Sequence, residues 1–154
     1  VLATPATVSS KAYTTFLSSS RPGTFVIEQS CPEFVPMIES GELYGPKIKE
    51  IAQHYLEPLI KANVEVVILG CSHYPFLISV FSDLLPKHVR LVDPAIGVAF
   101  QLDTVLDTPK PMHFSSKTLA STRIYVTSDP IGFADAATPL LGVRPEVQLI
   151  NLRS

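Results

Sequence analysis

The hydrophobic positions along this chain follow two patterns that alternate. Short runs rich in β-branched residues are typical of buried strands, and the longer segments between them repeat apolar residues at helical spacing. The expected strands are residues 24–28, 64–69, 89–93, 123–128 and 146–152. The expected helices are residues 8–18, 33–40, 47–62, 75–85, 94–106 and 130–141. Because nearly continuous apolar strands alternate with helices, the sequence predicts an α/β fold with a parallel sheet flanked by helices.

Segment 47–62 shows the helical pattern most clearly. One stripe of it gathers apolar side chains, namely Ile48, Ile51, Ala52, Tyr55, Leu56, Leu59 and Ile60. Glu57 and Lys61 form a favourable i, i+4 pair on the polar face. Pro58 is expected to bend this helix or divide it in two. Segment 106–122, rich in Pro, Ser and Thr, is the best candidate for a linker.

Composition narrows the class of protein. A chain of 154 residues with 46% hydrophobic and 17% charged residues is a globular protein with room for a core. A net charge of -2 gives no basic footprint for nucleic acid or for an anionic membrane surface. No apolar run reaches transmembrane length and no signal peptide is recognisable, so we expect a cytoplasmic protein without a disulfide framework. The first residue is Val1 and not Met, which suggests a fragment of a longer protein.

The stretch VVILGCSHYP, residues 66–75, carries the candidate chemistry. Four branched apolar residues predict a strand, Gly70 permits a tight turn, and Pro75 suits the first turn of a helix. Ligands of parallel sheets bind at such strand ends, and the amides of a helix start stabilise a thiolate on Cys71. His73 can supply or hold a proton. Residue types alone equally allow a buried cysteine beside a capping Ser72 and an incidental histidine.

A family resemblance favours the catalytic interpretation. LGCSHYPFL (69–77) resembles the second cysteine motif of bacterial glutamate racemases, usually GCTHYP. Four further blocks resemble the same family in the same order, and together they cover roughly residues 1 to 100. They are ATPATVSSKAY (3–13), SCPEFVPMIESGE (30–42), YLEPLI (55–60) and LVDPAIGVA (91–99).

The resemblance implies inversion of glutamate by two cysteines on opposite faces of the substrate, with no cofactor. Cys71 would be one catalytic acid/base, and His73 would contact the substrate and assist the thiol. Ser72 stands where the family usually has Thr, which binds the substrate carboxylate. The implied partner is the small molecule glutamate, and the resemblance is compatible with a homodimer.

Three other residues have two interpretations each. Thr4 and Thr7 either touch the substrate carboxylate or cap the helix that begins near residue 8. Glu39 either orients His73, as a glutamate of the family does, or is a solvated carboxylate near a helix end. His54, His88 and His113 are expected on the surface, and no set of residues has the spacing of metal ligands.

The chain departs from the family at its beginning. The first lobe of the family, with its Asp-Ser pair, its Tyr-Gly pair and its Cys-Asn-Thr motif, has no counterpart before Val1. We therefore expect residues 1–94 to form the second racemase lobe, and residues 95–154 to be a segment that would normally return to the first lobe. The late strands should then pair only with each other or with an improvised sheet edge, and leave apolar surface exposed.

The missing motif leaves the second catalytic group open. Cys31 also follows a predicted strand, but Pro32 removes a backbone N–H there, so a packed thiol is the stronger expectation for it. Two other functions remain as alternatives. One is an aspartate racemase, although members of that type usually have Glu in place of His73. The other is a non-catalytic lobe.

Overall fold

The computed structural model describes residues 1–106 and 122–152, with the side chain of Asp103 excepted. The strands are β1 (Leu2–Ala3), β2 (Gln29–Ser30), β3 (Val66–Ile68), β4 (Arg90–Val92), β5 (Ile124–Val126) and β6 (Val147–Leu149). The helices are α1 (Pro5–Ser10), α2 (Ala12–Ser20), α3 (Phe34–Glu39), α4 (Pro46–Lys61), the 3₁₀ helix η1 (Tyr74–Leu77), α5 (Ile78–Leu84), α6 (Pro94–Val105) and α8 (Pro130–Leu141). Most of the predicted linker 106–122, with His113, lies outside the described residues.

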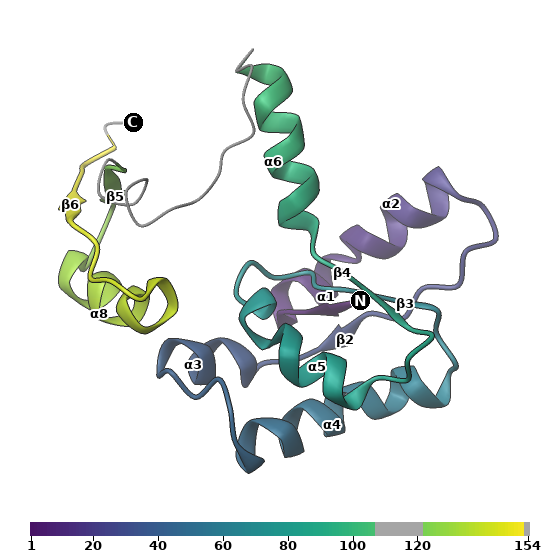
Figure 1. The fold of residues 1–154 in the computed structure, drawn as a ribbon. Helices are drawn as coiled ribbons and strands as arrows, with labels where there is room; N and C mark the ends of the chain where they lie inside the picture. Colours follow the sequence, from purple (N-terminus) through teal and green to yellow (C-terminus); the bar gives the residue numbers. More distant parts are fainter. Residues whose placement is uncertain (107–121, 153–154) are drawn as a thin grey trace.

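Four strands form one parallel arrangement. β1 pairs with β2 and β3 pairs with β4, all in parallel. A parallel bridge between Leu2 and Leu69 joins the two pairs, and the Gly70 N–H donates to the Leu2 carbonyl at 2.8 Å. The spatial order is therefore β2, β1, β3, β4, with helices packed around it (Figure 1). This confirms the predicted fold class.

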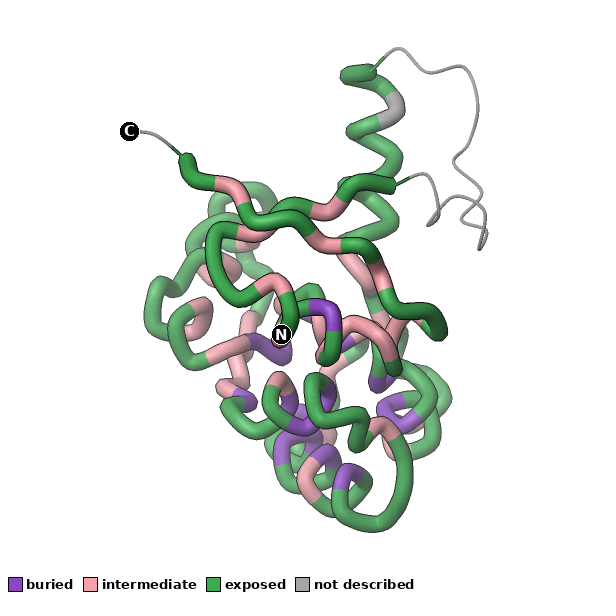
Figure 2. Tube along the Cα trace, turned by 90° about the vertical axis from the view of Figure 1, so that its left-hand side faces the viewer, coloured by how far each residue is buried: buried purple, intermediate pink, exposed green. Residues whose placement is uncertain are grey.

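The core lies under this sheet. The inward side chains of α4 are buried as its apolar stripe predicts: Ile48, Ala52, Tyr55, Leu56 and Leu59. The ring of Phe34 packs at 5.2 to 5.5 Å from the rings of Tyr55, Tyr74 and Phe81. Edge-on contacts of this kind add to the stabilisation from burial. Figure 2 shows the buried residues gathered in this part of the molecule.

Helix α4 is a single helix, so of the two effects expected of Pro58, bending or division, division is wrong. Pro58 lies in the last turn, where the lost N–H removes one hydrogen bond near the end of the helix. The predicted pair on its polar face is present, with Lys61 Nζ 2.8 Å from Glu57 Oε1.

Two other expectations need correction. Residues 24–28 form no strand, and β2 begins at Gln29, where it pairs with Leu2 of β1. The single helix expected over 8–18 is two helices, α1 and α2, separated by Lys11 in the left-handed conformation (φ 55°). Ser10 Oγ bonds the Thr7 carbonyl and accepts from Ala12 N there, which is how hydroxyl side chains compete with helix hydrogen bonds.

The C-terminal part forms a small unit of its own. β5 and β6 pair with each other in parallel and, within the described residues, with no other strand, as the sequence predicts. Leu140, near the end of α8, packs against the hydrophobic core described above. Helix α6 stands away from the sheet (Figure 1), and its large apolar side chains are exposed, among them Ile96 (73%) and Phe100 (74%).

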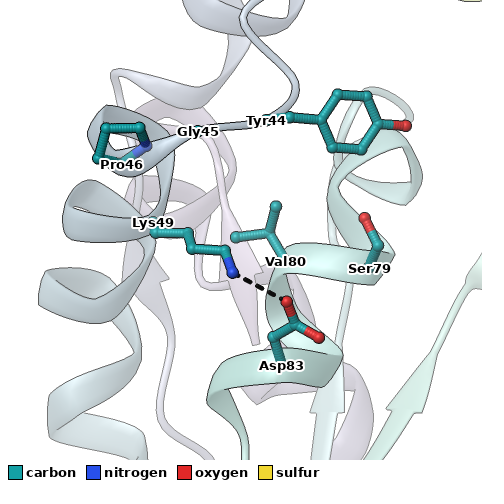
Figure 3. Close-up of a pocket in the computed structure, with 7 residues that line it drawn as sticks. All are labelled: Tyr44, Gly45, Pro46, Lys49, Ser79, Val80 and Asp83. Atoms are coloured by element: carbon teal, nitrogen blue, oxygen red, sulfur yellow. Dashed lines mark hydrogen bonds and ion pairs between the residues drawn. The ribbon is translucent and has the colours of Figure 1, made fainter.

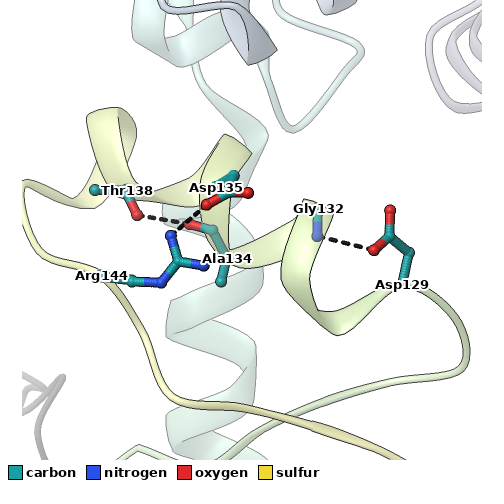
Figure 4. Close-up of polar contacts among 6 residues, drawn as sticks. All are labelled: Asp129, Gly132, Ala134, Asp135, Thr138 and Arg144. Atoms are coloured by element: carbon teal, nitrogen blue, oxygen red, sulfur yellow. Dashed lines mark hydrogen bonds and ion pairs between the residues drawn. The ribbon is translucent and has the colours of Figure 1, made fainter.

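The start of α8 has a defined cap. Asp129, in the left-handed conformation, accepts a hydrogen bond from the Gly132 N–H at 2.9 Å (Figure 4). A Cβ on Gly132 would lie 2.2 Å from the Asp129 carboxylate. Asp135 and Arg144 form an ion pair one turn further along. A side chain at Gly132 would therefore displace the capping carboxylate.

We expect Gly132→Ala to lower the free energy of unfolding by about 1 kcal/mol, the usual contribution of an N-cap. Gly97→Ala is the matched control, because a Cβ on Gly97 in α6 meets open space. It should increase the helix content of α6 and leave the midpoint of cooperative unfolding unchanged, because α6 is exposed. Urea titrations followed by far-UV circular dichroism measure both, and equal midpoints for the two variants would contradict the role of the cap.

Candidate active site

The candidate site lies at the carboxyl edge of the sheet. Cys71 and Thr4 are each two residues beyond the bridge between Leu69 and Leu2, so they extend adjacent parallel strands in the same direction. Cys31 follows β2 and Asp93 follows β4 at the same edge. This is the edge at which open parallel sheets bind ligands.

The loop that carries Cys71 is anchored on both sides. Before it, the Gly70 N–H bonds β1, and a Cβ on Gly70 would lie 3.0 Å from the Leu2 carbonyl oxygen. After it, Tyr74 is fully buried and its hydroxyl donates to the Cys31 carbonyl at 3.0 Å. Burial raises the pKa of Tyr74, so this donor keeps its proton. The predicted helix over 75–85 begins one residue earlier, as the tight turn η1.

Three side chains form a line that starts at the thiol. Cys71 Sγ lies 4.0 Å from Nδ1 of His73, and Nε2 of the same ring lies 3.2 Å from Oε1 of Glu39. Glu39 is the last residue of α3, so two segments 34 positions apart meet here. Glu39 is exposed, as expected for a solvated carboxylate near a helix end. It also contacts His73, which is the partner that the resemblance implies.

This arrangement favours one tautomer of the imidazole. When Nε2–H donates to the Glu39 carboxylate, Nδ1 is free to accept the proton of the Cys71 thiol. The resulting imidazolium would lie between a thiolate and a carboxylate. Exposed ion pairs add little to stability, so the contact between Glu39 and His73 matters for the orientation of the ring.

The three candidate hydroxyl residues differ in their surroundings: Thr4 and Thr7 cap a helix, and Ser72 is exposed. Thr4 Oγ1 accepts from Thr7 N at 3.4 Å and lies 3.0 Å from Thr7 Oγ1, so this pair caps α1. Both side chains are half-buried, whereas Ser72 is exposed beside the thiol. The capping interpretation of Thr4 thus has direct contacts, and a role in binding substrate stays a prediction.

Cys31 has the surroundings of a packed thiol. It is fully buried, its N–H donates to the Ala3 carbonyl at 2.9 Å, and its Sγ donates to the Gln29 carbonyl at 3.5 Å. Burial raises the pKa of Cys31 to about 12, and the negative charges of Glu33 and Cys71 add to the effect. A thiol that stays neutral and out of reach of solvent is unsuited to take a proton from a substrate.

One neighbour of the loop was not predicted. The half-buried Tyr13 of α2 packs its ring beside Gly70. Tyr13 is the second residue of α2, so its position depends on the helix break at Lys11. The apolar pattern of the sequence did not predict that break. His54 and His88 are exposed, as expected.

A surface pocket of about 550 Å³ lies elsewhere, between the start of α4 and α5 (Figure 3). It is lined by Tyr44, Gly45, Pro46, Lys49, Ser79, Val80 and Asp83. Its two charged groups neutralise each other, with Lys49 Nζ 3.0 Å from Asp83 Oδ2. We place the candidate site at Cys71 because acid–base groups converge there and none of them lines this pocket.

Two further searches covered the described residues. Among them, no cluster of three or more His, Cys, Asp or Glu side chains could hold a metal ion. In the same part of the chain, no helix combines the length and apolarity needed to cross a bilayer.

Comparisons with known proteins point to one family, although no protein-family model matches the chain. A glutamate racemase of Synechococcus sp. (strain CC9605) is 53% identical over 151 residues, covering 97% of this chain and 57% of the relative. One of Prochlorococcus marinus (strain NATL1A) is 43% identical, covering 99% of this chain and 58% of the relative. The crystal structure of a glutamate racemase from Francisella tularensis in complex with D-glutamate matches with a TM-score of 0.80 and 29% identity, over 97% of this chain and 56% of that one.

The fold and the side chains around Cys71 define an α/β protein with a candidate cysteine–histidine acid–base site at the edge of a parallel sheet. The similarity to the relatives extends over nearly the whole chain. Along nearly its whole length the chain is similar to curated glutamate racemases, and it spans a little over half the length of the relatives it matches.

We expect iodoacetamide at neutral pH to alkylate Cys71 faster than Cys31. Cys71 is partly exposed and next to His73, whereas burial raises the pKa of Cys31 to about 12 and shields its sulfur. Peptide mass spectrometry at timed intervals gives a rate for each cysteine in one sample. Equal rates, or a faster Cys31, would remove the case for Cys71 as the reactive thiol.

Proposed function

We propose that this chain carries one half of a glutamate racemase active site, which interconverts L- and D-glutamate once the other half is present. The line from Cys71 through His73 to Glu39 is the observation that carries the proposal. The identity to a named glutamate racemase over 97% of the chain supports it.

The proposed chemistry is a pair of proton transfers. Cys71 gives its proton to His73 Nδ1, and the thiolate then removes the α-proton from one face of glutamate. The carbanion spreads its charge into the α-carboxylate, which needs nearby donors and little water to be stable. An acid on the opposite face returns a proton and completes the inversion. The reverse reaction uses the same groups in the opposite order.

Substrate binding would involve the hydroxyl groups at the sheet edge. The exposed Ser72, next to the thiol, is suited to donate to the α-carboxylate through its hydroxyl and its backbone N–H. Thr4 extends the adjacent strand, and because one of the two hydroxyls of Thr4 and Thr7 donates to the other, one O–H of the pair is left to donate outward. His73 favours glutamate over aspartate as the substrate, because aspartate racemases usually carry Glu in its place.

The second acid–base group would come from the part of the relatives that this chain does not span. Inversion needs a group on each face of the α-carbon, and the buried, neutral Cys31 cannot serve the second face. Helix α6 exposes several large apolar side chains, which is typical of a surface that is covered by another part of a protein. We propose that residues 95–154 contact that missing part and residues 1–94 hold this half of the site.

The proposed product gives the reaction its place in the cell. D-Glutamate made in the cytoplasm would be consumed in peptidoglycan synthesis, and therefore in cell-wall formation and cell shape. Inversion at the α-carbon is an isomerisation, so neither oxidant nor reductant is needed.

We expect the chain alone to show no racemisation of L- or D-glutamate by circular dichroism. Adding the polypeptide that supplies the remaining length of a relative should restore interconversion, because closure then places groups on both faces. Cys71→Ser should abolish the restored activity and Cys31→Ala should keep it. Activity of the chain alone that depends on Cys71 would contradict the half-site proposal, and restored activity with aspartate only would contradict the substrate.

We expect Glu39→Gln to lower the restored kcat by about tenfold, the lower end of the range for removing the carboxylate that orients a metal-binding histidine. Glu42→Gln is the matched control, because Glu42 is a nearby exposed glutamate whose partner is Lys47. Racemisation rates of both variants, each with circular dichroism to confirm folding, decide the comparison. An equal effect of the two substitutions would reduce Glu39 to a surface carboxylate.

A further inference from the structure

The backbone just before Cys71 is enclosed on more than one side. A Cβ built on Gly70 would lie 3.0 Å from the Leu2 carbonyl oxygen, from Val1 Cγ1 and from Tyr13 Cε2. Two of these atoms belong to the first residues of the chain, and the third belongs to the ring of Tyr13 in α2. Gly70 is therefore held between β1 and an aromatic ring.

The ring of Tyr13 is itself held by its neighbours. Lys11, with φ 55°, turns α2 away from the direction of α1. The Glu28 carboxylate then accepts from Thr14 N at 2.8 Å and from the Thr14 hydroxyl, which fixes the first turn of α2. Hydrogen bonds to a carboxylate are among the stronger ones, so this clamp restrains the residue next to Tyr13.

Tyr13 also lies within electrostatic reach of the thiol. Burial raises the pKa of Tyr13, and negative charge on Cys71 and on Glu28 raises it further. The phenol therefore stays protonated at neutral pH. The ring occupies the space that a side chain on Gly70, the residue before Cys71, would need.

We propose that Tyr13 is a positioning residue for Cys71. Its ring holds the Gly70–Cys71 backbone against β1, and this keeps Cys71 Sγ directed at Nδ1 of His73. These two atoms are already 4.0 Å apart, so a small displacement of the loop would separate them further and weaken the contact. The inference rests on the proposed function only in taking Cys71 as the acid–base group.

The test is a double-mutant cycle on the rate at which iodoacetamide alkylates Cys71 in this chain. The variants are Tyr13→Leu, His73→Gln and the two together. His73→Gln should slow alkylation in the wild-type background but have no further effect in Tyr13→Leu, which corresponds to a coupling of about threefold or more. Tyr13→Phe keeps the ring and should react within about twofold of the wild type, inside the scatter expected without coupling.

Phe16→Leu is the matched control, because Phe16 is an aromatic residue of the same helix that is 67% exposed. It should leave the cycle unchanged. The proposal is overturned if folded Tyr13→Leu retains the full effect of His73→Gln, or if Tyr13→Phe is as slow as Tyr13→Leu. If Tyr13→Leu does not fold, Thr14→Val loosens the same clamp, and an unchanged His73 effect in that variant overturns the proposal.

These rates do not depend on glutamate turnover. If the alkylation rates show no coupling between Tyr13 and His73 while racemisation is restored, only the positioning role of Tyr13 is contradicted. Preserved coupling without any restored racemisation would defeat the proposed function and support the positioning of Cys71.

Discussion

The backbone hydrogen bond from Gly70 N–H to the Leu2 carbonyl is the interaction on which the rest of the structure depends. It joins two separate pairs of parallel strands into one arrangement. Because both partners are backbone groups at strand ends, it also places Thr4 and Cys71 at the same edge. A side chain at Gly70 would crowd the same carbonyl at 3.0 Å, so the junction favours glycine.

The buried aromatic residues support this junction from below. Tyr74 spans from the cysteine loop to the Cys31 carbonyl, and its ring packs on Phe34, which begins α3. The same short helix ends at Glu39, which meets His73 at the surface. The packing of the core and the orientation of the imidazole thus share one element, and a shift of α3 would be felt at the thiol.

The sequence predicted the elements whose pattern is local. The stripe of α4, the strands β3 to β6 and the bounds of α8 all follow from periodicity and from prolines at helix starts. It could not predict β2, because a two-residue strand is defined by its neighbour and not by its own propensity. The break at Lys11 was missed because it follows from the hydrogen bonds of Ser10 and not from the apolar pattern, and with it the position of Tyr13 was missed. The contact between Glu39 and His73 was anticipated from family resemblance, since no spacing rule brings together residues 34 positions apart.

Helix α6 has a consequence for the thermodynamics of assembly. A helix of 12 residues with no tertiary cover is marginally stable in water, so it exchanges with coil. Whatever polypeptide covers it shifts this helix–coil equilibrium, and part of the free energy of association offsets the entropy of ordering the segment. Association should therefore have a large negative heat-capacity change and a temperature-dependent affinity. The polypeptide that covers α6 therefore orders this helix in addition to completing the chemistry of the site.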